Sequence, residues 1–561
     1  MFTRPLPLPM QEAPEPTGVF ATIDSAINSV FEPFNEWAAK IIFWTPGFFP
    51  MPWIVMWLLI AAIVITVYLG FIQFRGLRVA TEVIRGKYSS PDDPGEIPHF
   101  QALTSAVSGT VGLGNIAGVG AAVTIGGPGA TFWMILAGLF GMATKFAECT
   151  LGVKYRTVYE DGTVSGGPFK YLPVAFSKFP KIVGTILTGI FAVAILFFGV
   201  GGGNMFQANQ TYSQAIEVTG GVEESFLANP AGGIIFGVVL AVIIGLVIIG
   251  GIKSIGRVTS TLVPFMGGIY VLACLVVIIG AIDQLPAAIG TIISGAFSPD
   301  SLTGGFIGVL IVGLQRAAFS NEAGLGSAPI AHSAVKTRRP VSEGFVALFE
   351  PFIDTVIICT MTALAITVAN TPFYNDTREQ VSADAAYDYG GGVAVTSDAF
   401  ESVISWFPYV LAVAVSLFAV STLITWSYYG NKAWNYLFGE SKTVTMIYRV
   451  IFLFFTVAGC VLTFDQVLGL ADSFLFVCGF VNLLGVYFLL PTIKREMNEY
   501  LADRKSGHLL EYGKRDHEKD IPVDDLANRG RDGSGASTST SGDSDPDDDG
   551  FGRGGATTPI R

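Results

Sequence analysis

The sequence predicts an all-α polytopic membrane protein with about eleven transmembrane helices. Hydrophobic residues make up 51% of the 561 positions and charged residues only 14%, and the mean hydropathy is +0.54. Apolar stretches of about 20 residues recur along the chain, which is the length that a helix needs to cross a hydrocarbon core of roughly 30 Å. The helices should therefore be membrane spans rather than a soluble bundle.

The elements are predicted in the following order. Residues 1–50 form an N-terminal segment, in which Ile23, Ile27, Phe31, Phe34, Trp37 and Ile41 recur at helical spacing and predict an interfacial helix. A first transmembrane helix lies within 51–74. Two groups of five spans follow, at 99–124, 128–153, 183–213, 231–251 and 258–281, and then at 304–333, 342–369, 401–430, 445–463 and 467–491. We interpret 99–281 and 304–492 as two repeats, and 494–561 as a charged, disordered tail.

Lysine and arginine are concentrated in alternate loops. Loops 214–230, 282–303 and 370–400 contain only Arg378, whereas the intervening loops are basic. Because Lys and Arg are retained on the cytoplasmic side, the pattern predicts a multi-pass protein of the cell membrane with its N-terminus outside and its C-terminus in the cytoplasm. The polar, proline-rich start has no apolar core, so we expect no cleavable signal peptide.

Two spans are interrupted at equivalent places in the two halves. The first break is Ser108-Gly109-Thr110-Val111-Gly112-Leu113-Gly114-Asn115, and the second is Phe319-Ser320-Asn321-Glu322-Ala323-Gly324-Leu325-Gly326-Ser327. Backbone that leaves a helix inside lipid must find partners for its N–H and C=O groups. The breaks lie five spans apart, which inverts their direction, so the sequence predicts a leucine-transporter-type fold of five-plus-five inverted repeats. Close helix packing is the alternative use of these glycines.

Four stretches resemble the family of alanine/glycine:cation symporters, also called sodium:alanine symporters or amino acid carrier proteins. They are 102–119 (ALTSAVSGTVGLGNIAGV), 126–134 (GGPGATFWM), 166–172 (GGPFKYL) and 315–329 (QRAAFSNEAGLGSAP). The resemblance covers about 20–500 and leaves out the acidic tail. Phe169 stands where the family commonly has Met or another apolar residue. The resemblance implies a sodium-coupled symporter that imports alanine or glycine by alternating access.

The substrate site is expected at the breaks. Free N–H groups at a half-helix end suit a carboxylate, and exposed carbonyls suit an ammonium group. Of the polar residues Asn204, Gln207 and Gln210, we favour Gln207 for a substrate contact, with hydrogen bonding between helices as the alternative. The expected substrate residues are Gly109, Thr110, Gly112, Gly114, Asn115, Gln207, Phe319, Ser320, Asn321, Gly324 and Trp426.

The sodium site is expected between the first break and the span at 401–430. Ser421/Thr425 and Thr422/Trp426 are i,i+4 pairs, and by the resemblance this helix faces the first broken helix and supplies hydroxyl oxygens, which a hard cation prefers. The expected ligands are Ser108, Gly109, Thr110, Ser421, Thr422 and Thr425. Bonding of these hydroxyls to their own helix carbonyls is the alternative.

Charged residues inside spans are costly and usually functional. Glu322 lies in the second break, so a proton remains an alternative coupling ion, and Arg316, Glu350 and Asp354 are candidates for gating pairs. We expect Lys145 and Glu148 to form a structural i,i+3 pair. No catalytic constellation is apparent, so we expect no enzyme, and neither a nucleic acid nor an obligate protein partner. A channel is the rival class, which would conduct without stoichiometric coupling.

Overall fold

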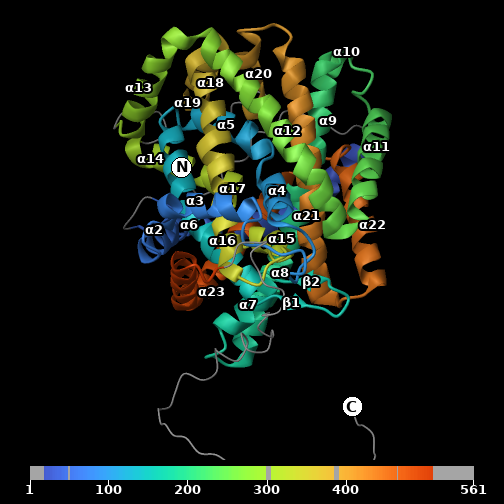
Figure 1. Cartoon of the computed structure of the whole chain (residues 1–561). Coiled ribbons are helices and arrows are strands. Elements are labelled where there is room, and N and C mark those ends of the chain that lie inside the picture. Colours follow the sequence, from blue (N-terminus) through green and yellow to red (C-terminus); the bar gives the residue numbers. More distant parts are fainter. Residues whose placement is uncertain (1–17, 48–50, 299–304, 384–390, 464, 510–561) are drawn as a thin grey trace, which may run out of the picture. The chain divides into compact units, whose positions relative to one another are not determined.

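The computed structural model describes residues 18–47, 51–298, 305–383, 391–463 and 465–509, and almost all of its regular structure is helical (Figure 1). In this part of the chain, eight helices are long and apolar enough to cross a membrane, or up to ten if each bent helix pair counts as one span. The predicted polytopic helical class is confirmed. The count of eleven spans stays a prediction.

Helix α1 (Val19–Ile42) packs its polar side against the C-terminal helix α23 (Asp465–Ser506). Asp24 accepts hydrogen bonds from the backbone N and the hydroxyl of Thr463, at 3.0 and 2.7 Å. Phe34 and Trp37 point outward with 59% and 67% of their surface exposed. Part of the apolar surface of α1 therefore turns away from the protein, as contact with lipid requires, whereas Phe31 packs against Phe197.

The span expected within 51–74 ends earlier than the sequence suggested. Helix α2 (Trp53–Tyr68) is followed by a bend of 72° into α3 (Ile72–Ile84). Gly70 and Phe71 both have positive φ, at 66° and 55°, which ends the helix. Arg75 and Arg78, which follow the predicted first span, thus lie on the amphipathic helix α3 rather than in a loop.

The first repeat begins with a broken helix, because α4 (His99–Thr110) and the segment beyond it are bent by 61°. That segment consists of the 3₁₀ turn η1 (Leu113–Asn115) and α5 (Ala117–Ile125). The later spans of this repeat are α6 (Ala130–Lys154), α8 (Lys181–Val200) with η2 (Gly201–Met205) and α9 (Phe206–Val218), α11 (Pro230–Ile248) and α12 (Gly251–Gly280).

The second repeat also begins with a broken helix, α14 (Gly305–Asn321) and α15 (Ala328–His332). A composite span follows, made of α16 (Pro340–Ala347), α17 (Phe349–Pro351), η4 (Phe352–Cys359) and α18 (Thr360–Ala369). The last spans are α21 (Phe407–Phe438), α22 (Lys442–Gly459) and α23. Both repeats thus open with a broken helix, the order expected of a leucine-transporter-type fold.

Short helices and one hairpin lie in the connections between the spans, and the sequence pattern did not predict them. The loop after α6 carries a hairpin of β1 (Thr157–Val158) and β2 (Val164–Ser165), and then α7 (Pro168–Ala175). The other connections hold α10 (Gly221–Glu224), η3 (Ile282–Gln284), α13 (Leu285–Ala296), α19 (Pro372–Ala383) and α20 (Gly391–Glu401). In Figure 1, α10, α13, α19 and α20 lie toward the top, and the hairpin and α7 toward the bottom.

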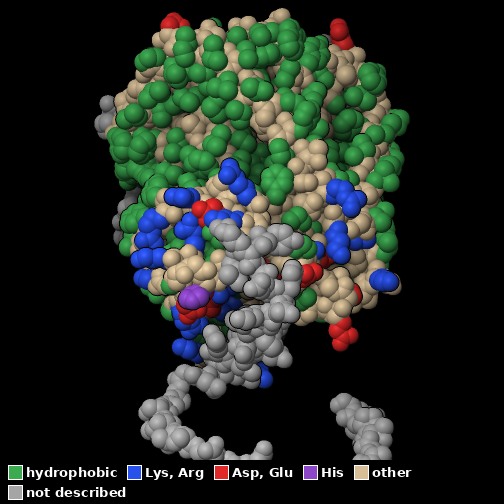
Figure 2. Space-filling view, viewed as in Figure 1, with side chains coloured by type: hydrophobic (Ala, Val, Ile, Leu, Met, Phe, Trp, Pro, Cys, Tyr) green, Lys and Arg blue, Asp and Glu red, His purple; other side chains and the backbone are tan. Residues whose placement is uncertain are grey.

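The connections that hold α10, α13, α19 and α20 thus lie at the end of the bundle opposite the hairpin and α7, and the orientation in the membrane stays a prediction. Figure 2 shows Lys and Arg side chains in the lower part of the visible face and hydrophobic side chains over the upper part. Helix α23 continues to Ser506, past residue 494 where we placed the start of the tail. The remaining tail, 510–561, lies outside the described residues, as do residues 1–17 of the N-terminal segment.

Candidate functional site

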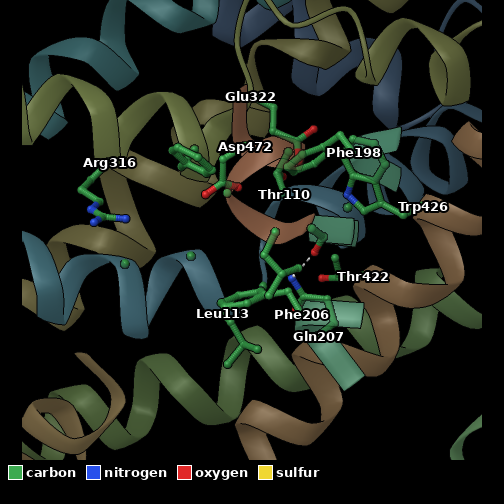
Figure 3. A pocket seen from close by; sticks show the side chains of 18 residues that line it. Thr110, Leu113, Phe198, Phe206, Gln207, Arg316, Glu322, Thr422, Trp426 and Asp472 are labelled. Atoms are coloured by element: carbon green, nitrogen blue, oxygen red, sulfur yellow. Dashed lines mark hydrogen bonds between the residues drawn. The ribbon is translucent and has the colours of Figure 1, made fainter. Parts of the chain in front are cut away.

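A pocket of about 210 Å³ lies where the two broken helices approach each other (Figure 3). This volume is below the roughly 300–1,000 Å³ of pockets for drug-sized ligands, so it suits a small molecule. Besides the two breaks, α5, α8, η2, α9, α14, α21 and α23 supply its wall. The lining residues are Gly109, Thr110, Gly112, Leu113, Gly114, Gly118, Phe198, Gly202, Phe206, Gln207, Arg316, Phe319, Glu322, Thr422, Trp426, Leu468, Gly469 and Asp472.

The first break contributes residues of its backbone turn to the pocket wall. Helix α4 ends at Thr110, and the Gly112 N–H donates to Oδ1 of Asn115 at 2.9 Å. The N–H groups of Leu113 and Gly114 begin the turn η1, and the first N–H groups of a helical turn have no partner inside it. A Cβ on Gly112 would lie 2.7 Å from Oγ1 of Thr422, so only glycine fits there.

The second break is held by protein groups instead. Its residues Glu322, Gly324 and Gly326 all have positive φ, at 54°, 91° and 80°. The N–H groups of Gly324 and Gly326 donate to the carboxylate of Glu148 at 3.1 and 2.9 Å, and the Gly324 carbonyl accepts from Asn482 at 2.8 Å. Gly324 was expected to bind substrate, but a buried carboxylate on α6 already occupies its donor.

An oxygen-rich cluster joins α4 to α21. The hydroxyls of Ser421 and Thr422 lie 3.4 and 3.2 Å from the Ser108 carbonyl, and 2.8 and 3.0 Å from the Phe418 carbonyl. The Thr425 hydroxyl lies 3.1 Å from the hydroxyl of Ser108 and 3.1 Å from the carbonyl of Ser105. Four of the six expected sodium ligands therefore meet in space.

Gly109 and Thr110, the other two, lie at the edge of this cluster and on the pocket wall. Hydroxyl and carbonyl oxygens in this number are the donor set that suits a hard cation such as sodium. The bonds of Ser421 and Thr422 to the Phe418 carbonyl lie within α21, so these hydroxyls also make the bonds to their own helix that the sequence left open as the alternative. The carbonyl of Ser105 was missed from the sequence, since any residue offers a carbonyl and only the packing brings this one to α21.

Aromatic rings and one amide complete the wall. Trp426 packs edge-on against Phe198, with ring centroids 4.7 Å apart. Gln207 donates through Nε2 to the Gly202 carbonyl at 3.2 Å, while its Oε1 is buried without a hydrogen-bond partner. Asn204 instead donates to the Phe452 carbonyl at 2.7 Å. Of these two residues, Gln207 lines the pocket, whereas Asn204 is bonded to another helix.

Three charged side chains also line the pocket. Glu322 and Arg316 were expected from the sequence, and Asp472 of α23 was not. The positive charge of Arg316 acts on the Asp472 carboxylate. An aspartate within the apolar stretch 467–491 was the signal that could have found it.

Several expected residues lie behind the pocket wall. Asn115 and Ser320 both hydrogen-bond the Asp354 carboxylate at 2.6 Å, and Asn321 donates to Thr355 at 3.0 Å. Their side chains therefore support the breaks rather than line the cavity.

The remaining buried charges pair across helices. Lys145 bonds Glu350 of α17 at 2.8 Å rather than forming the local pair expected with Glu148. His332 lies 2.5 Å from Glu343 and 3.5 Å from Glu350, and His99 also bonds Glu343. Among the described residues, no salt bridge joins Arg316 to Glu350 or Asp354, and the gating role of these three residues stays a prediction.

Outside the spans, Arg156 ties together the loops that flank the two broken helices. Its guanidinium donates to the carbonyls of Pro94 at 2.7 Å, Ser333 at 2.7 Å, Val335 at 2.5 Å and Thr337 at 2.8 Å. Burial lowers the pKa of Arg156 to about 10, which still leaves it charged at neutral pH. The loop before α4 and the loop after α15 therefore share one cationic clamp.

Comparison with known proteins gives a consistent picture. Residues 35–514 match the model of the sodium:alanine symporter family. The sodium/alanine symporter AgcS of Methanococcus maripaludis is 37% identical over 81% of this chain and 95% of its own length. The probable sodium/glutamine symporter GlnT of Bacillus subtilis is 33% identical over 81% of this chain and 89% of its own. Among solved structures, MhsT in complex with L-phenylalanine aligns with 74% of this chain and 99% of its own, at 17% identity and a TM-score of 0.47.

Proposed function

Because the chain belongs to the sodium:alanine symporter family, we propose that it is a sodium-coupled symporter that imports small neutral amino acids, alanine and glycine, across the cell membrane. It works by alternating access, with the N-terminus outside and the C-terminus in the cytoplasm. The name of AgcS supports sodium-coupled transport of alanine, and the name of GlnT supports sodium coupling. The residues of the pocket support it independently.

One observation carries the proposal: Gln207, whose buried Oε1 has no hydrogen-bond partner, and Leu113 and Gly114, whose N–H groups begin a helical turn, line the same small cavity. Oε1 of Gln207 lies 3.8 Å from the place that a Cβ on Gly112 would take. An amino acid is a zwitterion and needs acceptors for its ammonium group and donors for its carboxylate. In the proposed pose, the N–H groups of Leu113 and Gly114 hold the carboxylate and Gln207 accepts from the ammonium group.

The coupling ion occupies the oxygen cluster of Ser108, Ser421, Thr422 and Thr425 in this proposal. Thr422 belongs both to this cluster and to the pocket wall. An ion that fixes Thr422 and the end of α4 also fixes the backbone that binds substrate. By linkage, substrate must then strengthen sodium binding by the same factor.

Substrate size is set by the aromatic wall. Trp426, buried against Phe198 and Tyr429, closes one side of the cavity. Overpacking a tight site costs about 1–3 kcal/mol. A methyl side chain therefore fits better than a branched one.

A second candidate is proton coupling, favoured by one specific observation. Glu322 lies on the pocket wall, at the second break, and bonds the Ser327 hydroxyl at 2.5 Å. A carboxylate in this position could exchange a proton with the pocket. The two candidates differ in which gradient drives uptake.

The test is uptake of radiolabelled alanine into proteoliposomes that contain the full chain. Gradients of Na⁺, K⁺ and pH are imposed separately. We expect saturable accumulation driven by Na⁺ alone, and competition by glycine but not by leucine. Accumulation driven only by a pH gradient would select the proton-coupled alternative, and non-saturable flux without accumulation would indicate a channel.

A further inference from the structure

A second cavity, of about 350 Å³, lies between α4, α12 and η4, and we call it the apolar crevice. Of the described residues that line it, only Thr104 has a polar side chain, and its hydroxyl bonds two carbonyls of its own helix at 2.9 and 3.3 Å. Among the described residues, none lines both cavities: Gly109 and Thr110 wall the pocket, whereas Val107 and Val111 wall the crevice. The crevice is therefore a separate site on the far side of the first break.

The crevice exists because α12 lacks side-chain volume at this point. Pro264 lies inside the helix, and Gly267 and Gly268 follow it within about one turn. All three residues line the crevice, and a Cβ added at either glycine would meet no atom of the described chain within 4 Å. Helix α12 thus leaves a space against α4 that the protein's own side chains do not fill.

The rim of the crevice belongs to the exposed apolar surface of the membrane spans. Phe100 on the rim is 41% exposed, and Phe265 and Leu272, which neighbour crevice residues along α12, are 59% and 64% exposed. The deepest residues, Val107 and Val111, are each 1% exposed. Since α4 and α12 are both parts of candidate membrane spans, the crevice continues the lipid-facing surface inward as far as the first break.

A hydrocarbon chain is the occupant that this crevice suits. Protein interiors contain few voids, because the walls of an empty space lose their dispersion contacts. Water does not compensate, since an ordered water needs two to four polar partners, and the one hydroxyl in the crevice is already bonded to its own helix. Inside the bilayer, the molecule that is present to fill an apolar space is a lipid chain.

Arg257 provides a complementary charge for the headgroup of such a lipid. It lies seven residues before Pro264, which places it on the same face of α12 and about 10 Å closer to the start of the helix. Its side chain is exposed, and in the described part of the chain it forms no salt bridge. A guanidinium binds phosphate oxygens in bidentate geometry, so a lipid chain in the crevice would bring its phosphate to a suitable partner.

We propose that the apolar crevice and Arg257 together bind one phospholipid, with a hydrocarbon chain in the crevice and the phosphate at the guanidinium. Val107 directly precedes Ser108 of the oxygen cluster, and Val111 belongs to the first break. The bound chain therefore supports the end of α4 from outside the pocket. This site requires only a membrane-spanning chain, so it does not depend on which solute or ion the protein carries.

The test is photolabelling of the purified full-length protein in detergent with phosphatidylglycerol that carries a diazirine on its acyl chain, followed by peptide mass spectrometry. We expect saturable adducts within 100–111 and 263–271. Gly268→Leu places a side chain in the open space and should abolish these adducts. Gly189→Leu on α8 is the matched control, because a Cβ at Gly189 also meets no described atom within 4 Å, and it should keep them.

Leucine favours a helix more than glycine does, so Gly268→Leu should fold, and Gly267→Leu is the second variant if it does not. Arg257→Gln removes the cation and should raise the lipid concentration for half-maximal labelling by about tenfold or more. An unchanged concentration would overturn the phosphate contact. Adducts that are as dense on α8 and α11 as in the crevice, and that persist in a folded Gly268→Leu protein, would show annular lipid only and overturn the site.

Discussion

The hydroxyl oxygen of Thr422 lies 3.2 Å from the carbonyl oxygen of Ser108, across 314 positions of sequence. Ser108 is on α4 at the start of the first break, and Thr422 is in the middle of α21. This contact joins the cavity that would hold substrate to the oxygen cluster that would hold sodium. Substitutions at this contact therefore test both substrate binding and sodium binding.

Thr422→Val should weaken sodium dependence without unfolding the protein. The substitution removes one hydroxyl at nearly constant volume, and loss of a metal contact lowers affinity by at least about tenfold. The sodium concentration for half-maximal alanine uptake measures this effect. Thr422→Ser keeps the oxygen and is the control, so an equal loss in both variants would argue for packing instead of coordination.

Gly112→Ala should abolish alanine binding, whereas Gly114→Ala should have a milder effect. A methyl on Gly112 would lie 2.7 Å from the Thr422 hydroxyl oxygen, but one on Gly114 would be 3.7 Å from its nearest neighbour. Isothermal titration of both purified variants with alanine compares them. Equal affinities in the two would contradict the close approach of the first break to α21.

Gly324→Ala should lower stability rather than block the cavity. Gly324 has a φ of 91°, which an L-residue adopts at a cost of roughly 1–2 kcal/mol. Its amide is bound to Glu148, so substrate contacts should survive in the protein that folds. Thermal unfolding and alanine affinity, measured on one sample, separate these effects. Unchanged stability together with lost alanine binding would show that Gly324 does contact the substrate.

Trp426→Ala should widen substrate selection toward larger amino acids. The ring is 1% exposed and packs on Phe198, so its removal opens space next to the cavity. Competition of leucine and glutamine against labelled alanine is the measurement. In Trp426→Phe, leucine should compete more strongly than in the unmodified chain but less strongly than in Trp426→Ala. Strong leucine competition in the unmodified chain would show that Trp426 does not limit the size of the substrate.

Glu148→Gln should destabilise the second break. Hydrogen bonds to a charged group contribute about 1.5–3 kcal/mol, and Glu148 accepts two of them from backbone donors. The melting temperature should fall. The control is Glu496→Gln, which removes a partly exposed salt bridge with Lys154 at 2.6 Å. This variant should change the melting temperature little.

Local patterns in the sequence predicted much of the fold. Spans at 128–153, 231–251 and 258–281 appear as α6, α11 and α12 with ends shifted by a few residues. They could be predicted because lipid demands long apolar helices whatever their neighbours are. The bend after Tyr68 and the short helices between spans could not, since they depend on contacts with other segments.

The candidate site also has features that the sequence predicted and features that it did not. Breaks at 108–115 and 319–327 could be located from glycines and polar residues in apolar stretches, and Gln207, Thr422 and Trp426 do lie on one cavity. The sequence did not indicate that Glu148 fills the second break or that Asp472 reaches the pocket. Both contacts join helices far apart in the chain.

The sequence by itself determined that this is a helical membrane protein with two broken spans, because hydrophobic length and helix-breaking residues act locally. Only the tertiary structure decided which break offers free backbone donors and which is sealed by a carboxylate. That outcome depends on whether a side chain from another helix reaches the unpaired N–H groups. Glu148 reaches those of Gly324 and Gly326, whereas Leu113 and Gly114, whose N–H groups begin a helical turn, line the cavity.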